Sequence, residues 1–116
     1  MKYMLLIYGD EQAAAKATPE QLQAQSDAYE EFTKSIVATG NFLDGDPFLP
    51  TSAAKTVAVH DGQTTTAPGP FEATTQQLLA YYKVEADDEA QALEMAARIP
   101  GARTGTIEVR PVMTFD

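Results

Sequence analysis

An α+β fold with one antiparallel sheet is predicted by the order of the elements and by two strongly apolar segments. Residues 2–8 and 77–84 carry apolar side chains on both faces, which is typical of central strands. A helix follows each segment, and residues 106–112 alternate like an edge strand that contains Pro111. The order β-α-β-ribbon-β-α-β predicts a ferredoxin-like split βαβ sheet, with two helices on one face and an inserted β-ribbon.

Length and charge restrict the class of protein. The chain has 116 residues, which fits a single domain over residues 1–116 with one core. Its net charge of -9 argues against direct binding of nucleic acid, which requires clustered Lys and Arg, and against an anionic membrane surface.

The composition offers few residues of the kinds that bind metals or nucleotide cofactors. There is no Cys, there is one His, and no glycine-rich phosphate loop is present. We therefore expect no metal and no cofactor. The N-terminal apolar run is too short for a signal peptide or a membrane span, so a cytoplasmic protein is expected.

The first helix has well-marked ends. Thr18 and Gln21 form a capping-box pattern, and Gly40 marks the stop. Gln25 interrupts the apolar face, where it is either a packing edge or one wall of a pocket. The apolar positions of that face are Leu22, Tyr29, Phe32 and Ile36.

The middle of the chain predicts a hairpin. Asp61 and Gly62 supply the turn signal, and the return strand at 63–66 is polar, so the ribbon is expected to be exposed. Phe71 follows a Pro-Gly-Pro turn and is expected to pack. Asp87 is the predicted cap of the second helix.

A second subunit is expected on the open face of the sheet. The helices cover one face, so one set of apolar side chains from the first strand is left towards water. We expect a two-fold homodimer, in a dimeric α/β-barrel-type assembly. The two sets are Met4, Leu6 and Tyr8, and Tyr3, Leu5 and Ile7.

Three segments, "MKYMLLIYGDE", "GPF" and "AARIPGARTGTIEVRPV", together resemble the YCII-related family in its DGPF-domain branch. The resemblance implies a dimeric ferredoxin-like fold. It also implies that some relatives are enzymes that act on small cyclic or aromatic metabolites through a His-Asp pair. Members of the branch are associated with extracytoplasmic-function sigma factors, which implies a regulatory partner.

The chain departs from the family pattern at its reactive positions. Pro68 stands where the DGPF motif has its Asp. The His-Asp pair aligns near Tyr29 and Ile99, and neither residue performs acid–base work near neutral pH unless the tyrosine pKa is shifted. No catalytic residue is therefore assigned.

A ligand site, if inherited from such relatives, is expected where the first strand ends, the first helix passes and the second helix ends. Asp10, Tyr29 and Arg98 are its predicted polar lining, and Tyr8 and Tyr81 its walls.

Other polar residues have plainer interpretations. His60 is expected to be an exposed turn residue, because no oriented partner surrounds it. The three C-terminal arginines suit either salt bridges or a small anion site, and we favour salt bridges. They are Arg98, Arg103 and Arg110.

Three functions remain open. The protein is a non-catalytic regulatory protein, a binding module for a small metabolite, or a cofactor-independent enzyme of the lyase, isomerase or dehydrochlorinase type. Loss of the His-Asp pair favours the first two.

Overall fold

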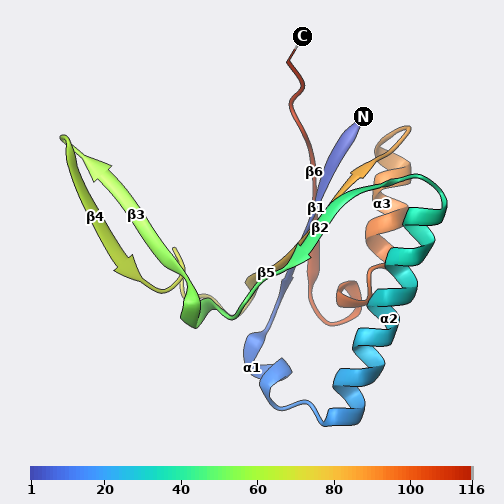
Figure 1. Cartoon of the computed structure of the whole chain (residues 1–116), viewed down its shortest axis with the longest axis horizontal. Coiled ribbons are helices and arrows are strands. Elements are labelled where there is room, and N and C mark those ends of the chain that lie inside the picture. Colours follow the sequence, from blue (N-terminus) through green and yellow to red (C-terminus); the bar gives the residue numbers. More distant parts are fainter. Residues whose placement is uncertain (116) are drawn as a thin grey trace.

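The computed structural model describes residues 1–115 and contains a four-stranded antiparallel sheet in the order β2-β5-β1-β6. Two long helices, α2 (Pro19–Ala38) and α3 (Glu89–Arg98), lie on one side of it (Figure 1). This arrangement confirms the predicted ferredoxin-like α+β fold, including the two central strands. The strands of the sheet are β1 (Lys2–Gly9), β2 (Phe42–Pro47), β5 (Gln77–Glu85) and β6 (Thr106–Pro111).

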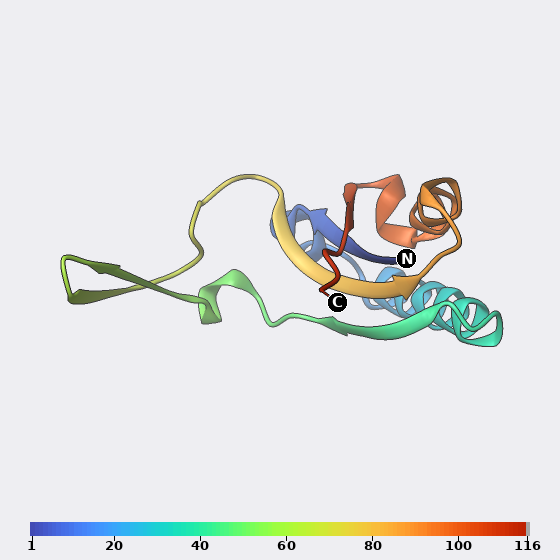
Figure 2. The same ribbon diagram turned by 90° about the horizontal axis from the view of Figure 1, so that it is seen from above.

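A two-stranded ribbon projects from the sheet on the side away from the helices (Figures 1 and 2). It consists of β3 (Lys55–His60) and β4 (Gln63–Pro68), as expected from the polar return strand. Asp61 and Gly62 have φ values of 52° and 77° and make the hairpin turn. The short elements are α1 (Glu11–Ala15) and the 3₁₀ turns η1 (Thr51–Ala53) and η2 (Pro100–Arg103).

Helix α2 begins as its sequence predicts. The Thr18 hydroxyl accepts from the Gln21 amide at 3.1 Å, and the Gln21 side chain accepts from the Thr18 amide at 2.9 Å. Phe32 and Ile36 are buried against the sheet. Leu22 was expected on the same face but is 48% exposed, because the first turns of α2 extend beyond the end of the sheet (Figure 1).

The cap of α3 lies one residue later than predicted. Asp88, not Asp87, accepts from the Gln91 amide at 2.9 Å. The Gln91 side chain in turn accepts from the Asp87 amide at 2.6 Å. This reciprocal pairing places the first helical turn at Glu89, where its charge suits the helix dipole.

The core lies between the sheet and the two helices. Strand β1 sends alternate side chains into it, and α3 contributes small residues that let the helix approach the sheet closely. The most fully buried large side chains are Leu5, Ile7, Ile36, Val84, Met95 and Ile99.

A bulge interrupts the pairing of β1 with β5. Ile7 pairs with Ala80 and Tyr8 pairs with Leu78, so Leu79 is an extra residue on β5. Strict alternation would place Leu78 with Ala80, but the register puts Leu78 beside Tyr8 on the open face. Leu79 packs instead against Gly9 on the helix side.

The open face of the sheet is apolar along β1, whereas the neighbouring strands place Lys83, Glu108 and Arg110 on it. Tyr3, Leu5 and Ile7 are buried towards the helices, whereas the opposite side chains of β1 remain half-exposed. These are Met4, Leu6 and Tyr8. Phe71, which was expected to pack, is 88% exposed, because residues 69–76 form a loop that stands off the sheet.

None of the helices within residues 1–115 has both the length and the apolar composition needed to cross a bilayer.

Candidate functional site

The candidate site lies at the end of β1. Gly9 ends the strand, and the Asp10 carboxylate accepts from the Gln12 amide at 2.9 Å, which starts α1. Helix α1 then turns the chain so that α2 passes across the strand end. A cavity of about 340 Å³ remains between α1, α2, the end of β1 and the turn η2.

The walls of this cavity are mainly apolar, with a few polar groups. Ile7, Leu79 and the alanines of α1 supply the apolar surface. The lining also includes residues with polar side chains, which are Tyr8, Asp10, Gln21, Gln25, Tyr29 and Thr104. The composition suits a small cyclic molecule with one or two hydrogen-bonding groups.

A second cavity of about 370 Å³ adjoins the first, between α2 and strands β2 and β5. The two cavities share Ile7, Gln25, Tyr29 and Leu79 in their walls. The bulge that moves Leu79 to the helix side therefore shapes both of them.

Tyr29 stands where the two cavities meet. The side chain is half-buried, and burial raises the pKa of its hydroxyl, although the nearby Gly101 amide opposes this in part. A Cβ added to Gly101 would lie 2.5 Å from the Tyr29 hydroxyl oxygen. A side chain at position 101 would thus press on the tyrosine and on Ile7. The raised pKa keeps the hydroxyl protonated at neutral pH.

The hydroxyls of Thr33 and Tyr82 form a hydrogen-bonded pair in the cavity wall beside Tyr29. The Thr33 hydroxyl donates to the Tyr29 carbonyl at 2.8 Å and lies 2.6 Å from the Tyr82 hydroxyl. Since the threonine proton is already used, Tyr82 is the donor in the second bond. Tyr82 also packs edge-to-face on Phe32, so this wall is rigid.

The structure brings Tyr8, Asp10 and Tyr29 together in the first cavity. Arg98 lies elsewhere, on the outer surface between α2 and α3. Its guanidinium donates to Glu94 at 2.6 Å and to Ser35 at 3.1 Å, and it covers the Phe32 ring. It sits one residue before Ile99, whose side chain is fully buried, so helical geometry turns Arg98 away from the cavity.

Salt bridges account for two of the three C-terminal arginines. Arg98 pairs with Glu94, and Arg110 pairs with Glu108. The interpretation of these residues as ion pairs is confirmed for both.

Tyr81 contributes to the wall of the second cavity, but its hydroxyl serves another purpose. It donates to Asp44 at 3.0 Å and to Asp46 at 3.3 Å, across the register of β2 and β5. These hydrogen bonds and the carboxylate charges raise the pKa of Tyr81 to about 12. The Tyr81 ring also stacks on Phe48.

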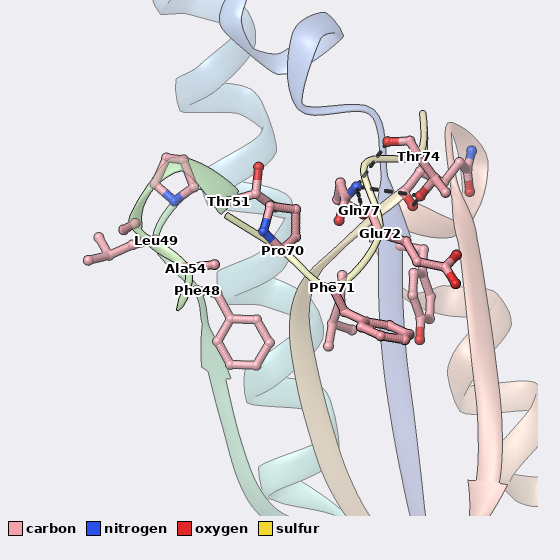
Figure 3. Close-up of a pocket in the computed structure, with 14 residues that line it drawn as sticks. Phe48, Leu49, Thr51, Ala54, Pro70, Phe71, Glu72, Thr74 and Gln77 are labelled. Carbon is pink, nitrogen blue, oxygen red and sulfur yellow. Dashed lines mark hydrogen bonds between the residues drawn. The ribbon is translucent and has the colours of Figure 1, made fainter. Parts of the chain in front are cut away.

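A wider groove lies at the base of the ribbon (Figure 3). Its volume is about 800 Å³, and Phe48, Leu49, Pro70, Phe71 and Leu78 give it an apolar lining. The loop above it is held by the Gln77 side-chain amide, which donates to the carbonyls of residues 72 and 74 at 2.7 and 3.0 Å.

Comparison with known proteins identifies the family. A model of the YCII-related domain matches residues 1–116. The chain belongs to the YCII-related family. It is also 29% identical, over 117 residues, to an uncharacterized protein of Rhizobium meliloti (strain 1021), with 99% of this chain and 94% of that protein covered. Membership of the DGPF branch stays a prediction.

In this YCII-related protein, the two positions expected from the sequence to align with the His-Asp pair lie in different surroundings. Tyr29 borders both cavities, whereas Ile99 is fully buried in the core. Sequence reasoning did not find Thr33, Tyr82 or Thr104. Thr33 lies four residues after Tyr29, a spacing that places both on one helix face and could have indicated it.

Proposed function

We propose that this protein binds a small cyclic or aromatic metabolite in the paired cavities between α2 and the sheet, without catalysing its conversion. The observation that carries the proposal is the half-buried Tyr29 hydroxyl, held over Gly101 at the junction of two mainly apolar cavities. A protonated phenol in such surroundings suits a hydroxyl or carbonyl partner.

The charged residues in and near the first cavity favour a neutral ligand. Asp10 lies in the lining, and Arg98 is engaged with Glu94 outside it. An anionic ligand would meet a carboxylate without a compensating cation from that arginine. A neutral molecule is therefore favoured over the small carboxylate that an arginine site would hold.

The alternative is a cofactor-independent lyase, isomerase or dehydrochlorinase. Such an enzyme needs a base with an oriented partner. Of the described residues that line the first cavity, Asp10 is the carboxylate, and it already accepts a hydrogen bond from the Gln12 amide as a helix cap. Because the pKa of Tyr29 is raised, its hydroxyl stays protonated near neutral pH and does not act as the base, so binding is the better-supported role.

A thermal-shift screen of neutral hydroxylated and carbonyl-bearing cyclic compounds tests the proposal, since a ligand of the native state raises its apparent stability. For any hit, Tyr29→Phe should weaken binding by about 0.5–1.5 kcal/mol, the net value of one hydrogen bond. Arg98→Lys is the control and should leave the affinity unchanged. Conversion of the hit, followed by NMR, would favour the enzyme instead.

A further inference from the structure

The molecule has an unusually large surface for its mass. Its accessible area is 8221 Å², whereas a monomeric protein of 12.5 kDa exposes about 6,200 Å². Its radius of gyration is 16.2 Å, against about 13.4 Å for a compact domain of 116 residues. The excess of about 2,000 Å² lies in the range that one subunit of an obligate dimer buries.

The ribbon is one source of this excess. Every residue of β4 is exposed, as are five of the six residues of β3. Val57 and Val59 are 66% and 61% exposed and share one face of the ribbon. An isolated two-stranded ribbon is marginally stable in water, so this one needs a surface to pack on.

The ribbon also lies on the side of the sheet that the helices leave uncovered. It projects away from the helices, towards the side that the open face of β1 and β5 looks out on (Figures 1 and 2). The groove of about 800 Å³ lies in the corner between the ribbon and that face (Figure 3). Tyr8 and Leu78 belong to both the open face and the groove, so the apolar surface is continuous.

We propose that the ribbon is an arm that holds a second copy of this chain. A partner sheet packed on the open face enters the corner between sheet and ribbon. Because a two-fold interface is self-complementary, each arm then lies along the other subunit, with Val57 and Val59 against it. The groove at the base of each ribbon is completed by residues of the partner.

The chemistry of the surface agrees with a copy of the same chain rather than an unrelated partner. Large exposed apolar side chains occur on both the ribbon and the corner beside the sheet, as in obligate homodimers, although polar residues also line the groove. The apolar side chains are Phe48, Leu49, Val57, Val59, Phe71 and Leu78, with exposures from 36% to 88%.

Paired substitutions on the two faces of the ribbon test the arm. Val57→Asp with Val59→Asp alters the apolar face, and Ala58→Asp with Thr65→Asp adds the same charge on the opposite face, since Ala58 and Thr65 pair with each other. The dimer dissociation constant of each variant is measured by sedimentation equilibrium, and circular dichroism checks folding.

We expect the valine pair to raise the dissociation constant by about tenfold or more, as expected for losing buried valine contacts in both subunits. The control pair should stay within about threefold of the wild type. Equal weakening by both pairs, no change with the valine pair, or a monomeric wild type at 100 micromolar would each overturn the proposal.

A second readout uses the absence of Cys from the sequence. A single Val59→Cys variant, labelled with a polarity-sensitive fluorophore, should shift to shorter emission wavelengths as the protein associates. The same label at Ala58→Cys should shift less. An emission that does not depend on protein concentration at either position would contradict the arm.

Discussion

At the scale of single residues, the Tyr29 hydroxyl limits the size of the side chain at position 101, and a double-mutant cycle measures this coupling. Gly101→Ala would place a methyl group 2.5 Å from the tyrosine hydroxyl and 3.1 Å from Ile7. We expect a loss of about 1–3 kcal/mol of unfolding free energy from this overpacking, measured by urea denaturation.

Removing the hydroxyl should relieve part of that strain. Gly101→Ala should cost less in a Tyr29→Phe background than in the wild type, by about 0.5 kcal/mol or more. Equal costs in the two backgrounds would show that the Ile7 contact, and not the tyrosine, restricts this position.

Tyr81 gives a prediction about pH. Its pKa is raised from 10 to about 12 by the hydrogen bonds to Asp44 and Asp46. Its contribution to stability is therefore complete below pH 10 and disappears as the pH rises through about 12.

Ultraviolet absorbance of ionised tyrosine checks this assignment. The wild type and Tyr81→Phe should give equal ionisation signals at pH 10, where the Tyr81 hydroxyl is still protonated, and the wild type should gain an extra tyrosinate only at higher pH. Tyr81→Phe should also be less stable than the wild type at pH 8. A difference already present at pH 10 would contradict the hydrogen bonds to the two carboxylates.

At the scale of the elements, the N-terminal cap of α3 gives two neighbouring aspartates different roles. Asp88→Ala removes the side chain that accepts from the Gln91 amide and should cost about 0.5–2 kcal/mol of unfolding free energy. Asp87→Ala is the matched control, because only the Asp87 backbone takes part in the cap, and it should cost much less. A larger loss from Asp87→Ala would place the cap where the sequence predicted it, and equal losses would contradict the assignment to Asp88.

This cap also illustrates how much of the fold the sequence could predict. Periodicity and capping patterns predicted the long helices and the central strands, since these signals are local. The choice between Asp87 and Asp88 was not predictable, because both are aspartates and so have the same intrinsic preference for a cap. The bulge at Leu79 was missed for a related reason: an extra residue in one strand depends on pairing with another strand.

The candidate site was predictable to a similar extent. Tyr8, Asp10 and Tyr29 lie in one cavity because a strand end, a helix and a turn converge there. Arg98 was misplaced because the expectation counted distance along the chain, whereas the side-chain direction changes by about 100° per residue on a helix. The hydroxyl of Tyr82 could not be linked to Thr33 without the packing of β5 on α2.

At the scale of the whole molecule, the open face of the sheet predicts a dimer whose two faces respond differently to charge. Leu6→Lys lies on the half-exposed face and should leave a folded monomer, because a buried lysine pair opposes association. Leu5→Lys is the matched change on the other face, where the side chain is fully buried, and should unfold the subunit. Light scattering and circular dichroism distinguish the two outcomes, and a folded dimer of Leu6→Lys would rule out this face as the interface.

The most direct test of ligand binding is amide chemical-shift mapping of the isotopically labelled protein with a hit from the thermal-shift screen. We expect the largest changes around Gln25, Tyr29 and Leu79, where the two cavities meet, and at Gly101 beside them. The amides of Ala97 and Arg98, on the outer surface between the helices, should change little and serve as the internal control. Changes confined to that outer surface, or to the groove lined by Phe48 and Phe71, would contradict a site between α2 and the sheet.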